Sequence, residues 1–186
     1  VAIVGAGTIG LLTLQFAKIF GASKIAAFDI DDDRLEDARK LGADDDINTL
    51  SADCLDRAMS ITDGKGFDYV YGTSGAVPTI KMPLALAANR ACVCYIGTPT
   101  GDVDFSIDEW EQINRKEITL TGSWMSYSAP FPGHEWTTVA HFFTTNQLKH
   151  DGVVHKTYPL SQIADAFEAF KHCGEVKGKI LIDSEA

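Results

Sequence analysis

The chain begins with "VAIVGAGTIG", and this stretch restricts the possible folds more than any other part of the sequence. Residues 1–4 form an uncharged, largely β-branched run, typical of a strand buried on both faces of a parallel sheet. Glycines follow at positions 5, 7 and 10, and apolar residues then recur at helical spacing as far as Phe20. A strand, a GxGxxG turn and a helix in this order predict a phosphate-binding loop.

Each glycine of this loop has a separate predicted task. Gly5 permits the tight turn, Gly7 lets the backbone approach a pyrophosphate, and Gly10 lets the helix pack closely on the sheet. Backbone N–H groups at the start of the helix, where Thr8 and Ile9 stand, are suited to receive negative phosphates.

Asp29 is the second part of the predicted site. It lies near the end of the apolar run "KIAAFDI" (24–30), which we expect to be the second strand. A carboxylate at this place accepts hydrogen bonds from an adenosine ribose and repels a 2′-phosphate, so NAD is favoured over NADP. The alternative is structural: the glycines only turn the chain, and Asp29 only caps the next helix.

Strand and helix patterns alternate up to Trp124. Asp31 to Asp33 are expected to cap a second helix that ends at Gly42, Ser51 to cap a third, and Ser106 with Glu109 to form a capping box. A further helix is expected over 77–87, with Pro83 as an irregularity. Further strands are predicted at 67–72, 91–97 and 117–124. The alternation predicts an α/β fold, a doubly wound parallel sheet of the Rossmann type with strand order 3-2-1-4-5-6.

The pattern changes after Trp124, where prolines and a glycine interrupt the alternation. We expect a dinucleotide-binding domain over residues 1–125 and a C-terminal helix and strand segment over 126–186. In that segment Ile163, Ala166, Phe167 and Phe170 are predicted to point inward, and "GKILI" to form a closing strand.

Charge and cysteine usage exclude several classes of partner and site. The net charge of -10 argues against nucleic acid and anionic membranes, because phosphates would be repelled. The opening run lacks the basic region of a signal peptide and is too rich in glycine and threonine for a membrane span. Cys54, Cys92, Cys94 and Cys173 form neither a disulfide framework nor a metal knuckle, which predicts a cytoplasmic location.

Other classes of nucleotide-binding protein share parts of this pattern. None of the five tyrosines has a lysine four residues later, which excludes the short-chain dehydrogenases. An S-adenosylmethionine-dependent methyltransferase also joins a glycine-rich turn to an acid after strand two, but its loop typically reads GxGxG and position 9 here is Ile. A module that only senses the nucleotide is the third possibility.

Several segments together carry a resemblance to the zinc-containing medium-chain alcohol and polyol dehydrogenases. They are the first 48 residues, "GFDYVYGTSG", "YIGT", "RKEITLTGSW" and the closing "GKILI", so the resemblance covers essentially the whole chain. Within the family, "GSWMSYSAPFPGHEW" is most similar to dehydrogenases of polyol phosphates such as galactitol 1-phosphate, with sorbitol and threonine dehydrogenases as near neighbours. The resemblance implies oxidation of a secondary alcohol to a ketose phosphate with NAD.

The resemblance also assigns further cofactor residues. Ile9 would lie near the pyrophosphate; Asp29, Ile30 and Arg34 would hold the adenosine. Thr73, Ser74 and Gly75 would line the cofactor channel, and the nicotinamide end would be formed by Ile96, Gly97, Thr98, Ser123 and Trp124. No catalytic residue is expected among these 186 residues.

The catalytic zinc of such enzymes is bound in a domain upstream of the first strand, and no pattern here supplies its ligands. We therefore expect a fragment that binds the dinucleotide but oxidises nothing alone, with residues 126–186 as the segment that would complete the absent GroES-like catalytic domain. Without that domain, residues such as Trp124 and Phe131 are expected to be exposed. The resemblance further implies a homodimer or homotetramer, with dimer contacts through the edge strand.

Overall fold

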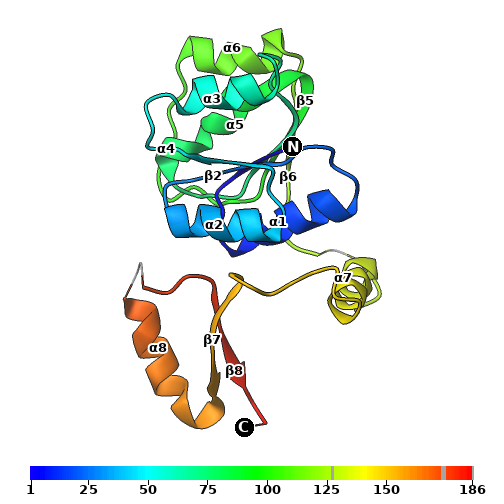
Figure 1. Ribbon diagram of the computed structural model, residues 1–186, viewed down its shortest axis with the longest axis vertical. Coiled ribbons are helices and arrows are strands. Elements are labelled where there is room, and N and C mark those ends of the chain that lie inside the picture. Colours follow the sequence, from blue (N-terminus) through cyan, green and yellow to red (C-terminus); the bar gives the residue numbers. More distant parts are fainter. Residues whose placement is uncertain (127, 173–174, 186) are drawn as a thin grey trace.

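The computed structural model describes residues 1–126, 128–172 and 175–185. Its larger unit is a six-stranded parallel sheet with helices on both faces (Figure 1). The elements in chain order are β1 (Ala2–Val4), α1 (Thr8–Ile19), β2 (Ala26–Asp29), α2 (Asp32–Leu41), β3 (Asp45–Asn48), α3 (Cys54–Ile61), β4 (Phe67–Gly72), α4 (Val77–Ile80), α5 (Met82–Leu86), β5 (Ala87–Tyr95), α6 (Ile107–Arg115) and β6 (Thr119–Gly122). The strand order is β3-β2-β1-β4-β5-β6, which confirms the predicted doubly wound fold.

The sheet separates two apolar clusters. Helices α1 and α2 cover one face, and α3, α5 and α6 cover the other (Figure 1). On the α1 side, Ile3 packs with Leu11 and Leu14, while on the opposite side Val4 and Phe28 pack with Phe67. Neighbouring residues of β1 thus point to opposite clusters, as the alternation of side chains along a strand requires.

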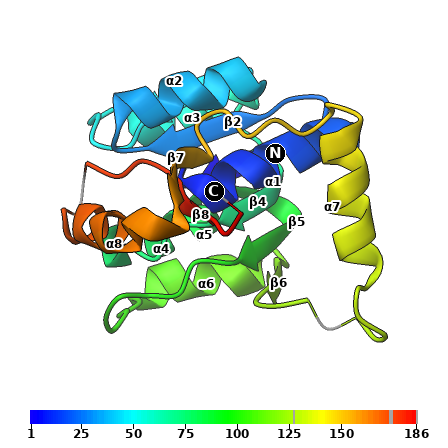
Figure 2. The ribbon, with the colours of Figure 1, turned by 90° about the horizontal axis from the view of Figure 1, so that it is seen from below.

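A smaller unit, the C-terminal unit, follows the sheet. It contains α7 (His134–Thr144), β7 (Val154–Pro159), a short 3₁₀ turn (Leu160–Gln162), α8 (Ile163–Lys171) and β8 (Lys179–Asp183). Strands β7 and β8 pair in parallel and form a separate two-stranded sheet. Seen from below, β7 and β8 lie under the six-stranded unit, with α7 and α8 on opposite sides (Figure 2).

Several predicted helix ends are confirmed. The Asp31 carboxylate caps α2 by accepting hydrogen bonds from the backbone N–H groups of Asp33 and Arg34, and Gly42 ends this helix with a φ of 111°. Ser106 and Glu109 form the predicted capping box of α6. These termini were recognisable because each depends only on residues a few positions apart.

Two local predictions were wrong. Ser51 does not cap the third helix: the N-cap residue of α3 is Asp53. The single helix expected over 77–87 is instead the pair α4 and α5, which meet at Lys81. Pro83 lies in the first turn of α5, where its missing N–H leaves no helical hydrogen bond unmade, so the proline marks a helix start.

The inward face predicted for α8 was also wrong. Only Ala166 of the four residues is buried; Ile163, Phe167 and Phe170 are exposed. Leu148 and Val153, which precede β7, are buried, and Val153 packs in the α1-side cluster. Trp124 and Phe131 are exposed by 70% and 75%, as predicted. Among the residues described, no helix is long and apolar enough to cross a bilayer.

Candidate functional site

The glycine loop connects β1 to α1 at the carboxyl edge of the sheet. The N–H of Gly5 donates to the carbonyl of Phe28 over 2.7 Å, which ties the loop to β2. The Thr73 hydroxyl donates to the Gly5 carbonyl at 2.6 Å, so the loop is also attached to the end of β4. Gly5 has a φ of 103°, a conformation that side chains rarely adopt, and this explains the glycine at this turn.

The other two glycines meet opposite surroundings. A Cβ added to Gly10 would lie 1.8 Å from the Gly5 carbonyl oxygen, so the helix start and the loop backbone leave no room for a side chain. A Cβ added to Gly7 would meet nothing within 4 Å. Gly10 therefore serves internal packing, whereas Gly7 leaves open space above the backbone, as the predicted approach of a pyrophosphate requires.

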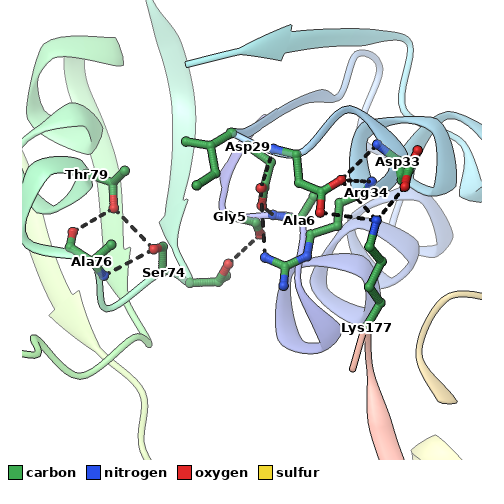
Figure 3. A network of polar contacts seen from close by, with 12 residues as sticks. Gly5, Ala6, Asp29, Asp33, Arg34, Ser74, Ala76, Thr79 and Lys177 are labelled. Atoms are coloured by element: carbon green, nitrogen blue, oxygen red, sulfur yellow. Dashed lines mark hydrogen bonds and ion pairs between the residues drawn. The ribbon is translucent and has the colours of Figure 1, made fainter. Parts of the chain in front are cut away.

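Asp29 joins the loop to the second strand. Its carboxylate is 7% exposed, and one oxygen accepts a hydrogen bond from the Ala6 N–H at 2.7 Å while the other accepts from the Asp31 N–H at 3.0 Å (Figure 3). Arg34 Nη1 lies 3.9 Å from this second oxygen. A carboxylate has about four acceptor positions, so these contacts leave capacity for a ligand hydroxyl.

A cavity of about 400 Å³ opens beside the loop. Its wall is formed by the loop, by the carboxyl ends of β1, β2, β3 and β4, by the starts of α1, α2 and α4, and by Lys179 of β8. The lining residues are Val4, Gly5, Gly7, Thr8, Ile9, Gly10, Phe28, Asp29, Ile30, Arg34, Thr49, Thr73, Ser74, Ala76, Thr79 and Lys179. The cavity thus lies where the strand order of the sheet reverses, between β1 and β4.

Most of the residues predicted from the sequence line this cavity, but not all. Ile9 also borders a second, apolar cavity of about 630 Å³, which Ile96 and Ser123 line without reaching the first. Gly75, Gly97, Thr98 and Trp124 line neither of these two cavities. The predicted set therefore divides between a loop cavity, an apolar groove beside α1, and four residues outside both.

Gly75 and Gly97 have a packing role in the described chain. A Cβ at Gly75 would lie 2.0 Å from the carbonyl oxygen of Thr98, and one at Gly97 would lie 2.5 Å from the carbonyl group of Ser74. The loops after β4 and β5 therefore touch through their backbones, and glycine is required at both contacts.

Three residues with polar side chains at the cavity were missed by sequence reasoning. Thr49 directly follows β3, and Thr79 lies in α4, where its hydroxyl donates to the Ala76 carbonyl at 2.8 Å. The rule that ligands bind beyond the carboxyl ends of parallel strands was the available signal for Thr49, once β3 was located. Lys179 comes from β8, and no local pattern connects it to the loop.

The arrangement fits a dinucleotide. The first turn of α1 carries no acidic residue, and its N-cap residue, Gly7, has no side chain that could cap the helix end, so the helix start can face an anion. The open space above Gly7 adjoins this helix start, and the Asp29 carboxylate stands at the end of β2. Groups suited to a phosphate and to a ribose hydroxyl thus border one cavity.

The described residues do not fit the zinc site that the resemblance associates with a separate domain. In residues 1–126, 128–172 and 175–185, no three His, Cys, Asp or Glu side chains lie close enough together to hold a metal ion. Cys54, Cys92 and Cys94 are free thiols, and Cys173 lies outside the described residues. We derive no step through a metal from these residues.

The fold and the loop together define a dinucleotide-binding domain of the Rossmann type. The zinc-binding dehydrogenase family matches residues 8–145, and the chain belongs to this family. It is 30% identical over 182 residues to galactitol 1-phosphate 5-dehydrogenase of Escherichia coli K12, covering 98% of this chain and 52% of that protein. The crystal structure of the E. coli galactitol-1-phosphate dehydrogenase superposes with a TM-score of 0.88 at 30% identity, over 98% of this chain and 53% of the other.

Two further relatives are named for other substrates. D-arabitol-phosphate dehydrogenase of Enterococcus avium is 34% identical over 184 residues, which cover 98% of this chain and 49% of that protein. L-threonine 3-dehydrogenase of Bacillus licheniformis is 30% identical over 178 residues, which cover 95% of this chain and 50% of the relative. The chain thus spans about half the length of the curated relatives it matches.

Proposed function

We propose that this chain is the cofactor-binding part of an NAD-dependent, zinc-dependent dehydrogenase. The observation that carries the proposal is Asp29: its buried carboxylate ends β2, holds the glycine loop through Ala6, and borders the loop cavity. In such an enzyme bound NAD accepts a hydride from the alcohol carbon. The residues of this chain bind and orient the cofactor, with Gly7 and the start of α1 toward the pyrophosphate and Asp29 and Arg34 toward the adenosine ribose.

The remaining predicted residues extend this proposal along the cavity. Ile30, Thr73 and Ser74 form the walls next to the loop, and Ile96 and Ser123 lie beyond Ile9 on the side expected for the nicotinamide. We propose that Gly75 and Gly97 support this wall through their backbone packing, and that Thr98 and Trp124 reach the nicotinamide only in the intact enzyme.

For the substrate we propose a polyol phosphate such as galactitol 1-phosphate, oxidised at a secondary hydroxyl to a ketose phosphate. The match to polyol-phosphate dehydrogenases over nearly the whole chain supports this choice. The threonine dehydrogenase match supports a second candidate, a sorbitol- or threonine-type enzyme. Because the relatives are about twice as long, we propose that turnover needs residues beyond these 186, and that the chain alone binds NAD without oxidising a polyol phosphate.

The proposed binding is tested by calorimetric titration of the chain with NAD, NADP and S-adenosylmethionine. We expect NAD to bind more tightly than NADP, because the Asp29 carboxylate repels a 2′-phosphate. Asp29→Asn keeps the size of the side chain but removes its charge, and it should lower the preference for NAD about tenfold or more. Binding of S-adenosylmethionine in place of NAD would support the methyltransferase alternative.

We further propose a homodimer or homotetramer in a reducing, cytoplasmic location. The four residues of β6 at the edge of the sheet are exposed, and an exposed edge strand can pair with a second copy. The free thiols of Cys54, Cys92 and Cys94 support the location. Light scattering on the purified chain measures the oligomeric state, and a monomer at all concentrations would contradict the proposed assembly.

A further inference from the structure

Lys177 connects the C-terminal unit to the adenosine end of the cavity. It lies between α8 and β8, yet its ammonium contacts the start of α2, nearly 150 residues earlier in the chain (Figure 3). Lys177 Nζ is 3.3 Å from Asp31 Oδ2 and also forms an ion pair with the Asp33 carboxylate. The Lys177 and Asp31 side chains are about one-third exposed and the Asp33 side chain is 75% exposed, so this clasp (Lys177, Asp31 and Asp33) lies at the protein surface.

The clasp continues directly into the cavity wall. Asp31 offers its side chain to Lys177 and its backbone N–H to Asp29 Oδ1, at 3.0 Å. The other oxygen of Asp29 accepts from Ala6 in the glycine loop. A continuous set of contacts thus runs from Lys177 through Asp31 and Asp29 to the loop, which makes the orientation of the Asp29 carboxylate dependent on the position of Asp31.

The backbone around Lys177 is also held in place. Gly178, with a φ of 99°, packs so closely that a Cβ there would lie 2.6 Å from the Val153 carbonyl oxygen. The next residue, Lys179, donates its N–H to the same carbonyl at 2.7 Å, and its side chain lines the cavity. Val153 is buried in the α1-side cluster. The start of β8, directly after Lys177, is therefore attached through Val153 to the cofactor-binding unit.

The clasp places a positive charge among several negative ones. Asp29, Asp31, Asp32 and Asp33 place four carboxylates at the start of α2, and a dinucleotide would bring further negative charge beside them. Partial burial alone would raise the pKa of the Asp31 carboxyl, but hydrogen bonds from Lys177 and from the Arg34 and Asp33 N–H groups outweigh it and lower this pKa. The hydrogen bond to Asp33, with the contact to Asp31, raises the pKa of Lys177. Both groups thus remain charged around neutral pH, and the Lys177 ammonium offsets part of the repulsion among the carboxylates.

We propose that Lys177 is a positioning residue for the dinucleotide: its clasp with Asp31 and Asp33 seats β8 against the adenosine end of the cavity and holds Asp29 in the orientation that receives the ribose. This role rests on the proposed function, because it requires that the chain binds NAD. Lys177 acts through Asp31 and the local charge, without touching the cofactor.

The test compares NAD binding by Lys177→Gln, which removes the charge, and Lys177→Arg, which keeps it. At low salt, Lys177→Gln should bind NAD about fivefold more weakly, while Lys177→Arg should bind like the unaltered chain. The difference should fall below about twofold at 1 M NaCl, because exposed charges are screened. ADP-ribose should show the same loss as NAD, since the clasp acts on the adenosine end, and nicotinamide mononucleotide should show none.

A second variant and a stability measurement keep the test decisive. Asp33→Asn removes one partner of Lys177, so Lys177→Gln should weaken NAD binding less in this background than in the unaltered chain. If Lys177→Gln does not fold, Asp33→Asn by itself should weaken NAD binding in the same salt-dependent way. A merely structural lysine would lower the melting temperature of Lys177→Gln without changing the Kd for ADP-ribose.

The outcomes separate this inference from the proposed function. Failure of the unaltered chain to bind NAD would overturn both. Normal NAD binding by the unaltered chain, together with an unchanged Kd for folded Lys177→Gln at low salt, would overturn the positioning role alone. An equal loss in Lys177→Gln and Lys177→Arg would also overturn it, because the ionic contact would then not be the cause.

Discussion

The six-stranded unit and the β7–α8–β8 unit differ in where their apolar side chains lie. In the first, Phe28 is fully buried between the sheet and its helices and meets Phe67 edge to face, with ring centres 6.1 Å apart. In the second, Phe167 is 69% exposed although it directly follows buried Ala166 in α8. With Phe170, Ile180 and Ile182 it surrounds a shallow hollow of about 220 Å³.

The difference shows that apolar residues at regular spacing in the sequence can end up either buried or exposed. A parallel sheet with helices on both faces covers every strand, so its apolar residues are buried within the unit. A two-stranded sheet with a single helix has too few layers to cover both faces. The C-terminal unit instead gains its position from contacts with the larger unit. Gln15 of α1 shows this, because its side chain both donates to the Lys149 carbonyl at 3.1 Å and accepts from the Lys149 N–H at 2.8 Å.

The largest expected effect comes from a matched pair of phenylalanines. Phe28→Ala should lower the free energy of unfolding by about 3–5 kcal/mol, because it removes a fully buried ring and leaves a cavity. Phe167→Ala should change it by no more than about 0.5 kcal/mol, because that ring is mostly exposed. Urea denaturation measures both values. Similar losses in the two variants would break the comparison between the units.

The glycine loop tests whether tight packing extends to the polar site of the larger unit. Gly10→Ala should cost about 1–3 kcal/mol, because its new methyl group would overlap the Gly5 carbonyl. Gly7→Ala is the control: its methyl group enters open space, so the stability should stay within about 1 kcal/mol. NAD affinity should nevertheless fall in Gly7→Ala. Thermal unfolding and calorimetry distinguish the two effects, and equal destabilisation would contradict this division of roles.

Lys116 in the larger unit and Lys177 in the C-terminal unit extend the comparison to charged side chains. Lys116 is half-buried, and its Nζ donates to the carbonyls of Leu84, Ala85 and Ala87 at 3.0, 3.3 and 2.9 Å. Burial lowers its pKa. Lys116→Met should cost about 1–2 kcal/mol, because three carbonyl groups at the end of α5 lose their donor. Lys177→Met, in the exposed clasp, should change the melting temperature far less; the reverse ranking would be evidence against the contrast.

The smallest expected effect concerns Tyr95 in β5. Its hydroxyl donates to the Ile80 carbonyl at 3.0 Å, and burial raises its pKa to about 12. Because folding raises the pKa of the Tyr95 hydroxyl, its contribution to the free energy of unfolding is fully present below the pKa in the unfolded chain, about 10. This contribution is lost as the pH rises toward 12. Tyr95→Phe should cost about 0.5–1.5 kcal/mol at neutral pH.

The pH dependence provides the check on Tyr95. The difference in stability between the unaltered chain and Tyr95→Phe should shrink between pH 10 and 12, when measured by urea denaturation. Other groups that titrate in this range are present in both proteins and cancel in the difference. A difference that stays constant up to pH 12 would show that the Tyr95 hydroxyl is not held in its neutral form by burial.

The sequence predicted the parts of the fold that depend on neighbouring residues. The glycine loop, the Asp31 cap and the capping box at Ser106 each follow from a few adjacent positions. Strand β3 was not located, because Asp45–Asn48 is mostly polar and only Ile47 of this strand is buried. Its strand identity comes from backbone pairing with β2, which places Ile47 opposite Phe28.

In the candidate site too, the residues predicted from the sequence belong to local patterns, and the residues missed do not. Gly7 and Asp29 were predicted because the phosphate loop and the acid that follows it are local patterns. Lys177 and Lys179 were missed, since their approach to α2 and to the cavity depends on how two distant segments pack. The same reason explains the wrong inward face of α8: helical spacing shows which residues share a face, but not whether another layer covers that face.

By itself, the sequence determined a glycine-rich strand–loop–helix, an acid at the end of the second strand, and a doubly wound sheet around them. Only the tertiary structure decided that the Asp29 carboxylate holds Ala6 of the loop, that Gly7 faces open space, and that Lys177 joins the C-terminal unit to the start of α2. The physical reason is the range of the interactions. Backbone conformation and residue periodicity depend on neighbouring residues and can be read from the sequence. Hydrogen bonds and ion pairs between distant segments exist only after the chain has packed.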